Sequence, residues 1–158
     1  MQVIVATDGS KASLSAAQQF KSFADPGKIT EVVIVAVVSP LAVVPFEDEL
    51  SQRTTPGSVD EAVNLSFEAE ARGATASLMD EFEGWGPAVS RRLRSGSPAS
   101  EIIKVAEELP ADLIVVAAGA RGLTATILIG STAQKLQHSA PCPVLVCRPT
   151  PHSERALA

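Results

Sequence analysis

Three short segments of the chain carry residue types that can hold a phosphorylated ligand. Asp8, in the Thr-Asp-Gly-Ser segment 7–10, has carboxylate oxygens that accept hydrogen bonds from ribose hydroxyls or amide groups. Gly119 and Gly122 flank a short loop in which the backbone can pass close to a ligand. A third segment, Gly-Ser-Thr at 130–132, stands where a helical pattern begins.

This third segment has the composition of a phosphate site at a helix start. The first N–H groups of a helix have no acceptor within it, and the helix dipole adds to their attraction for phosphate oxygens. Gly130 removes a Cβ from the approach, and the hydroxyls of Ser131 and Thr132 can donate further hydrogen bonds. The Arg121 guanidinium can also contact a phosphate. Each segment alone is a weak signal, because it also fits an ordinary turn or helix cap, and it is their order along the strands that makes a site plausible.

The elements that would position these segments follow from the hydrophobic pattern. Buried apolar runs alternate with helical patterns, which is typical of a parallel sheet with helices on both faces. Ligands bind such a sheet at the carboxyl ends of its strands, where the strand order reverses. The expected strands are Val3–Thr7, Val32–Val38, Ala88–Leu93 (at an edge), Leu113–Ala118 and Val144–Cys147. The expected helices run from Ser10 to Ala24, from Val59 to Glu83, from Pro98 to Leu109 with Ser97 as cap, and from Ser131 to His138.

The second helix and the residues before it lead to two further predictions. Residues 39–57 contain three prolines and an acidic cluster, and they are long for a strand-to-helix connection, which predicts a mobile flap near the strand ends. The residues expected to turn the second helix towards the sheet are Ala62, Leu65, Ala69, Ala76 and Met79.

Composition restricts the class of protein. A length of 158 residues fits one domain, and a formal net charge of −5 argues against nonspecific binding to nucleic acids or anionic membranes. The apolar runs are too short to span a bilayer. No basic segment with a cleavage site precedes the first apolar run, and the two cysteines fit a reducing compartment, so we expect a cytoplasmic protein.

Several of these stretches resemble the universal stress protein family. The similarity lies in Val3–Ser10, Asp112–Gly122, Gly130-Ser131 and His138–Val146. The resemblance implies an α/β fold of the adenine nucleotide alpha hydrolase type. Its features would be a single-domain, open, five-stranded parallel sheet of order 3-2-1-4-5 and helices on both faces. It also implies a domain at residues 1–148 with the flap at 39–57, a tail at 149–158, and a homodimer paired through the strand Val144–Arg148.

The resemblance further implies a nucleotide site. The ATP-binding branch of the family carries G-x2-G-x9-G-[ST], which places Gly119, Gly122, Gly130 and Ser131 on the phosphates and ribose. Asp8 and Val37 would lie against the adenosine end, and Arg121 and Thr132 would add contacts. Here only seven residues, 123–129, separate the second and third glycines. The expected ligand is therefore ATP or a smaller adenine nucleotide, AMP or cyclic AMP, with or without Mg²⁺.

Alternative functions stay open at this point. The chain could be a nucleotide-binding stress regulator, or a dimeric interaction module without a ligand that acts through its dimer surface or the 39–57 flap. A slow ATPase, with Asp8 helping to hold Mg²⁺, is a weaker alternative, because neither G-x-G-x-x-G nor the P-loop pattern G-x-x-x-x-G-K-[ST] occurs. We therefore expect no efficient enzyme and no catalytic residues. A flavin carrier is disfavoured by the absence of tyrosine and the single tryptophan.

Overall fold

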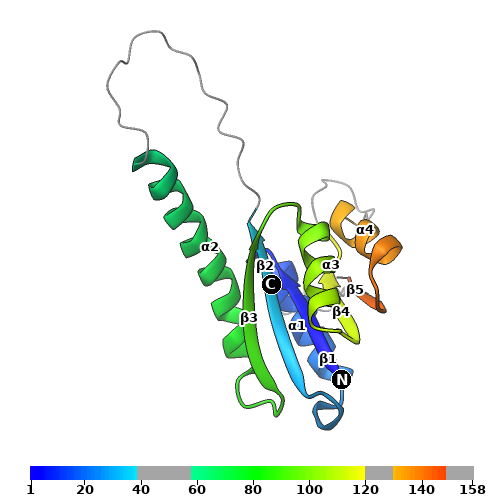
Figure 1. Cartoon of the computed structure of the whole chain (residues 1–158). Coiled ribbons are helices and arrows are strands. Elements are labelled where there is room, and N and C mark those ends of the chain that lie inside the picture. The colour runs from blue at the N-terminus through cyan, green and yellow to red at the C-terminus, as the bar shows by residue number, and fades with distance from the viewer. Residues whose placement is uncertain (39–57, 120–129, 149–158) are drawn as a thin grey trace, which may run out of the picture.

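The chain forms an open α/β sheet of five parallel strands. The computed structural model describes residues 1–38, 58–119 and 130–148, with the side chains of 58–68 and 70 excepted. The strand order is β3-β2-β1-β4-β5, which confirms the predicted order 3-2-1-4-5 (Figure 1). The strands are β1 Gln2–Thr7, β2 Glu31–Val38, β3 Ala88–Ser95, β4 Leu113–Ala117 and β5 Val144–Cys147. The predicted flap at 39–57 and tail at 149–158 lie outside the described residues.

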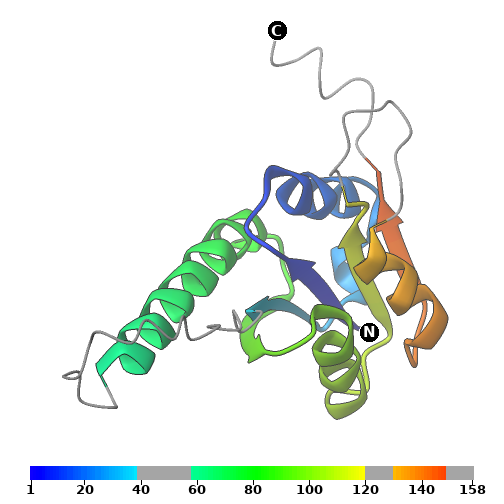
Figure 2. The same cartoon turned by 90° about the horizontal axis from the view of Figure 1, so that it is seen from above.

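Helices cover both faces of the sheet (Figure 2). They are α1 Lys11–Phe23, α2 Ser58–Phe82, α3 Pro98–Glu108 and α4 Ser131–Ser139, with a short 3-10 turn at Pro26–Lys28. Alternate strand residues enter opposite cores, because successive side chains of a strand point to opposite faces. Ile4 and Val33 pack with α3 and α4, whereas Val3 and Val32 pack with α1 and α2. This two-sided burial explains why the central strands are almost continuously apolar.

The sheet-facing side of α2 differs from the prediction. Ala69 and Ala76 are exposed, whereas Met79 is half-buried and packs against the core as predicted. Ala62 and Leu65 lie outside the described side chains. The described buried residues of α2 are Ala71, Thr75, Leu78 and Phe82. These four also follow helical spacing, and they include the larger side chains Leu78 and Phe82, whose burial removes more apolar area from water than alanines do.

The other expected elements agree with the structure to within two residues at each end. Ser10 caps α1 by accepting a hydrogen bond from the Ser13 N–H, as its position before the helix predicts. Ser97 stands at the N-cap of α3, but its side chain makes no capping hydrogen bond there. β3 lies at the sheet edge, as its mixed polar pattern predicts.

Candidate functional site

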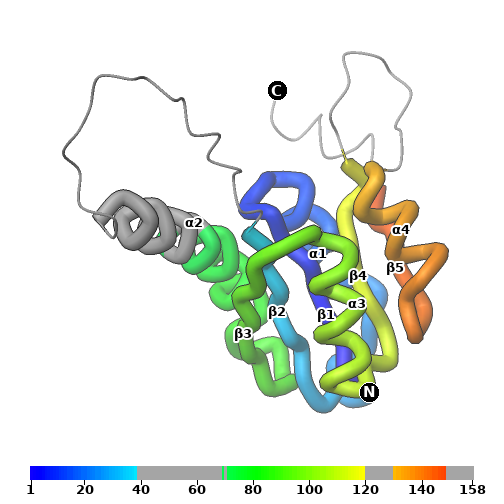
Figure 3. Tube along the Cα trace, turned by 45° about the horizontal axis from the view of Figure 1, so that its top comes forward, coloured from blue at the N-terminus to red at the C-terminus, as the bar shows by residue number. Residues whose placement is uncertain are grey.

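The candidate site lies at the carboxyl ends of β1 and β4. The chain passes from β1 to β2 and β3 on one side and then crosses to β4 on the other, so the strand order reverses between β1 and β4. The register pairs Val5 with Val115 across this junction and Thr7 with Ala36 on the other side of β1. Strands β1 and β4 therefore end at the same edge of the sheet, and the segments that follow them start there. Helices α1, α3 and α4 also begin at this edge (Figure 3).

A chain of hydroxyl groups fixes the turn after β1. The buried Thr7 and Ser13 hydroxyl oxygens lie 2.9 Å apart, and the Ser13 hydroxyl donates to the Ser10 carbonyl oxygen at 2.8 Å. The Thr7 hydroxyl therefore donates to Ser13 and accepts from the Gly9 N–H at 3.1 Å. The hydroxyls of Thr7 and Ser13 are thus both paired, which gives the turn one well-defined shape.

Asp8 projects from this turn into solvent. One of its carboxylate oxygens accepts the Ser10 N–H at 2.9 Å. Partial burial on its own raises the pKa of Asp8, but hydrogen bonds from the Ser10 hydroxyl and N–H are the main effects that outweigh it, and the pKa lies below its ordinary value. Asp8 is thus an ionised acceptor, with lone pairs left for a ligand hydroxyl or amide.

The same turn depends on glycine at position 9. Gly9 has φ of +79°, a conformation that other residues rarely adopt. A Cβ on Gly9 would lie 3.0 Å from the Ala74 Cβ, so α2 also packs tightly against this turn. The shape of the Asp8 turn is therefore fixed from both the sheet and α2.

Gly119 and Gly130 bring the end of β4 against the start of α4. A Cβ on Gly119 would lie 3.1 Å from the Gly130 Cα, and a Cβ on Gly130 would lie 3.2 Å from the Gly119 Cα. Both values are tighter than ordinary van der Waals contact. A side chain at either position would force the two backbones apart by a few tenths of an ångström, so this close packing favours glycine at both positions.

The start of α4 presents backbone N–H groups and hydroxyls. Gly130 occupies the N-cap and has no side chain that could accept a hydrogen bond from the first N–H groups of the helix. Ser131 is exposed and Thr132 is half-buried at this end. These N–H groups, which have no acceptor within the helix, and the helix dipole create a local positive potential in a protein that is acidic overall.

Most of the predicted site residues lie at one edge of the sheet. The structure puts Asp8 at the end of β1, Gly119 after β4, and Gly130, Ser131 and Thr132 at the start of α4, all at the same edge of the sheet. Val37 lies half-buried near the end of β2 and packs against the core beneath α3 and α4. The other two predicted residues, Arg121 and Gly122, lie outside the described residues.

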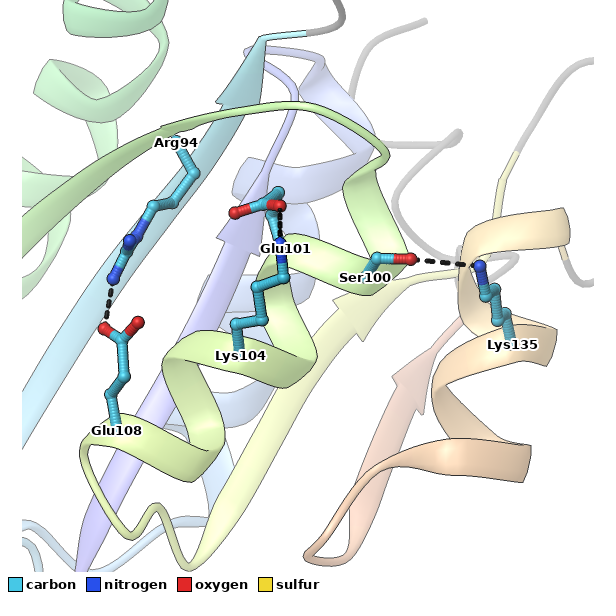
Figure 4. Close-up of polar contacts among 6 residues, drawn as sticks. All are labelled: Arg94, Ser100, Glu101, Lys104, Glu108 and Lys135. Atoms are coloured by element: carbon cyan, nitrogen blue, oxygen red, sulfur yellow. Dashed lines mark hydrogen bonds and ion pairs between the residues drawn. The ribbon is translucent and has the colours of Figure 1, made fainter.

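Sequence analysis missed a contact between α3 and α4 at this edge. The Lys135 ammonium donates to the Ser100 hydroxyl oxygen at 3.0 Å (Figure 4). The sequence does indicate that Lys135 lies on the same side of α4 as Ser131, because the two residues are four apart in a helix. The partner on α3 could not be read from the sequence, because it depends on how the two helices pack.

Within residues 1–38, 58–119 and 130–148, no group of three or more His, Cys, Asp or Glu side chains could hold a metal ion. In the same part of the chain, no helix combines the length and apolar character needed to cross a membrane.

Comparison with known proteins identifies consistent relatives. The model of the universal stress protein family matches residues 1–148. A universal stress protein of Methanocaldococcus jannaschii is 30% identical over 148 residues, which cover 93% of this chain and 81% of the relative. The solved structure of the universal stress protein UspA from Lactobacillus plantarum has a TM-score of 0.71 at 24% identity, covering 94% of this chain and 97% of that one.

Two further solved structures of this fold are described with a nucleotide. A universal stress protein family protein from Arabidopsis thaliana with AMP bound has a TM-score of 0.66 at 14% identity, covering 97% of this chain and 94% of that one. A universal stress protein in complex with cyclic AMP has a TM-score of 0.56 at 21% identity, covering 95% and 98%. At these identities the likeness shows the shared fold.

Proposed function

Because the chain belongs to the universal stress protein family, we propose that it is a regulatory protein that binds an adenine nucleotide where β1 and β4 end. The observation that carries this proposal is the backbone contact between Gly119 and Gly130. It places the first turn of α4 directly beside the end of β4, without side chains in between. A phosphate group fits such a surface, because backbone N–H groups can approach its oxygens closely.

Each element of the site has a role in this proposal. The N–H groups at Ser131 and Thr132, with their hydroxyls, hold phosphate oxygens. Gly119 and Gly122 let the backbone follow the phosphates, and Arg121 adds a charge. Asp8 accepts hydrogen bonds from the ribose hydroxyls or the base, and Val37 supplies apolar contact beside it.

The nucleotide is ATP, AMP or cyclic AMP. Support for the two smaller ligands comes from the related structures described with AMP and with cyclic AMP. The segment between Gly122 and Gly130 is two residues shorter than the family pattern, which shortens the chain by up to about 7 Å and also favours a smaller phosphate group. Mg²⁺ would enter with the phosphates of ATP.

Binding rather than turnover is the proposed activity. The P-loop pattern, whose lysine stabilises charge during phosphoryl transfer, does not occur in the sequence. The free thiols of Cys142 and Cys147 agree with a cytoplasmic location. We take residues 1–148 as the binding domain, residues 39–57 as a flap at its site, and residues 149–158 as a tail.

The direct test is to identify small molecules released when the freshly purified protein is denatured, by mass spectrometry. Calorimetric titration with ATP, AMP and cyclic AMP then gives the affinity of each. We expect at least one adenine nucleotide to bind with a stoichiometry of about one per chain. Failure of all three to bind, with none released, would contradict the proposal and favour a ligand-free interaction module.

We further propose that the protein forms a homodimer through the outer edge of β5, the side of this strand that faces away from β4. The Pro143 and Cys147 carbonyl oxygens accept hydrogen bonds from the Ile114 and Ala118 N–H groups at 3.0 and 2.8 Å. Because this pattern alternates along a strand, the N–H and C=O groups of Val144 and Val146 point away from β4. A second copy of Val144–Arg148 can satisfy them.

A further inference from the structure

Lys135 and Ser100 form a hydrogen bond beside the proposed phosphate site. Neither residue is among those to which the proposed function assigns a role. Lys135 is exposed on α4, and its ammonium donates to the hydroxyl of Ser100, in the first turn of α3. Figure 4 shows the lysine side chain reaching across from α4 to α3. The bond joins α3 and α4, the two helices that pack on the face of the sheet to which Ile4 and Val33 point.

From this contact we propose that Lys135 exchanges Ser100 for the phosphate group of the nucleotide and sets the preference for ligands of higher phosphate charge. The inference rests on the proposed function, because it assigns a specificity residue within the same site. Ser100 is a neutral acceptor, whereas a phosphate oxygen is charged, and hydrogen bonds between two charged groups are the stronger ones. A bound phosphate would therefore compete successfully for the lysine.

The geometry of α4 puts the ammonium within reach. Residues four apart on a helix have their Cβ atoms about 5–6 Å apart on one face, so Lys135 stands one turn behind Ser131. Helical side chains also lean towards the N-terminus of their helix, which directs the lysine towards the first N–H groups of α4 at Ser131. The four-carbon stem is long enough to cover that turn.

Two other cations near α3, among the residues that the structure describes, have carboxylate partners. Lys104 pairs with Glu101 at 2.6 Å, and Arg94 pairs with Glu108 (Figure 4). Releasing either cation would leave a carboxylate without its partner, whereas releasing Lys135 frees only a hydroxyl that water can satisfy. Of these three cations, Lys135 is the one whose transfer to a phosphate costs least.

The test compares affinities across ligands whose phosphate charge rises from cyclic AMP through AMP to ATP. In Lys135→Gln we expect the Kd for ATP to increase by about three- to ten-fold, that for AMP by less, and that for cyclic AMP by less than about two-fold. Lys135→Arg, which keeps the charge, should keep most of the affinity. Lys28→Gln carries the same charge change at the opposite end of the sheet and should change no Kd by more than about two-fold.

Ser100→Ala separates a ligand role from a structural one. If Lys135 serves the phosphate, removing its competitor leaves the ATP affinity unchanged or raises it by up to about three-fold. If the contact only braces α4 against α3, Ser100→Ala should weaken binding as much as Lys135→Gln does. That result, or an equal effect of Lys135→Gln on all three nucleotides, would overturn the inference. Wild-type protein that binds none of them would refute the proposed function itself.

Discussion

The backbones of Gly119 and Gly130 touch, with only 3.1 Å between the Gly130 Cα and the place that a Cβ on Gly119 would occupy. This contact joins the end of β4 to the start of α4. It explains the absence of side chains at the two positions. The proposed phosphate site depends on it directly.

Gly119→Ala should therefore destabilise the protein and weaken nucleotide binding together. The added methyl group must push β4 and α4 apart, and overpacking of this kind costs about 1–3 kcal/mol in the free energy of unfolding. Urea denaturation measures the first effect and calorimetric titration the second. An unchanged stability and an unchanged affinity would show that the two backbones do not meet as described.

Gly73→Ala is the matched control for that substitution. Gly73 lies within α2, and a Cβ there would meet nothing within 4 Å. Alanine should raise the free energy of unfolding by about 0.5–1 kcal/mol, because it favours the helix and reduces the freedom of the unfolded chain. Nucleotide affinity should not change.

Glu31 should contribute to stability against acid. Hydrogen bonds from Ser90, at 2.6 Å, and from Gln2, at 2.7 Å, lower the pKa of Glu31 below its ordinary value of 4.5. A lowered pKa in the folded state stabilises the protein above pH 4.5, and this stabilisation is lost as the pH falls through the folded value. Glu31→Gln should therefore show a smaller loss of stability between neutral and acid pH.

Titration of the Glu31 carboxyl group by NMR tests whether its hydrogen bonds lower its pKa. The midpoint of Glu31 should lie below 4.5 in the wild type and should rise in Ser90→Ala, which removes the main donor. A wild-type midpoint at or above 4.5 would contradict the hydrogen-bonded arrangement at the base of β2 and β3.

Val146→Pro should dissociate the proposed homodimer without unfolding the domain. Proline removes the N–H that points outward from β5, and it leaves in place the hydrogen bonds that Pro143 and Cys147 accept from β4. Light scattering during gel filtration should show a monomer for Val146→Pro and a dimer for the wild type. Val146→Thr keeps the N–H and should remain a dimer. A monomeric wild type, or a dimeric proline variant, would refute pairing through β5.

The sequence predicted the fold well because its signals were local. Apolar runs such as Val32–Val38 and the polar turn at Asp8 identify strands and strand ends without any knowledge of packing. The face of α2 was predicted wrongly, because Ala69 and Ala76 compete with Ala71, Leu78 and Phe82 at similar helical spacing. Which stripe is buried depends on the side chains that meet it from β2 and β3.

The candidate site was predictable only in part, because several of its contacts depend on how the elements pack. Asp8 and Gly130 stand out by type and by their place next to a strand or helix. The contact of Gly130 with Gly119, the hydroxyl chain from Thr7 to Ser13 and the bond from Lys135 to Ser100 each join groups that only the folded chain brings together. Such contacts need the packed structure.

The most direct test of nucleotide binding at α4 is titration of Ser131→Asp with the nucleotide that binds the wild type. An aspartate in the first turn stabilises the helix through its dipole, by about 0.3–1 kcal/mol, yet it places a carboxylate where the phosphate should sit. Gln137→Glu makes the same charge change later in α4 and should bind normally. We predict that Ser131→Asp is folded, at least as stable as the wild type, and unable to bind. Wild-type affinity in Ser131→Asp would contradict a phosphate site at the start of α4.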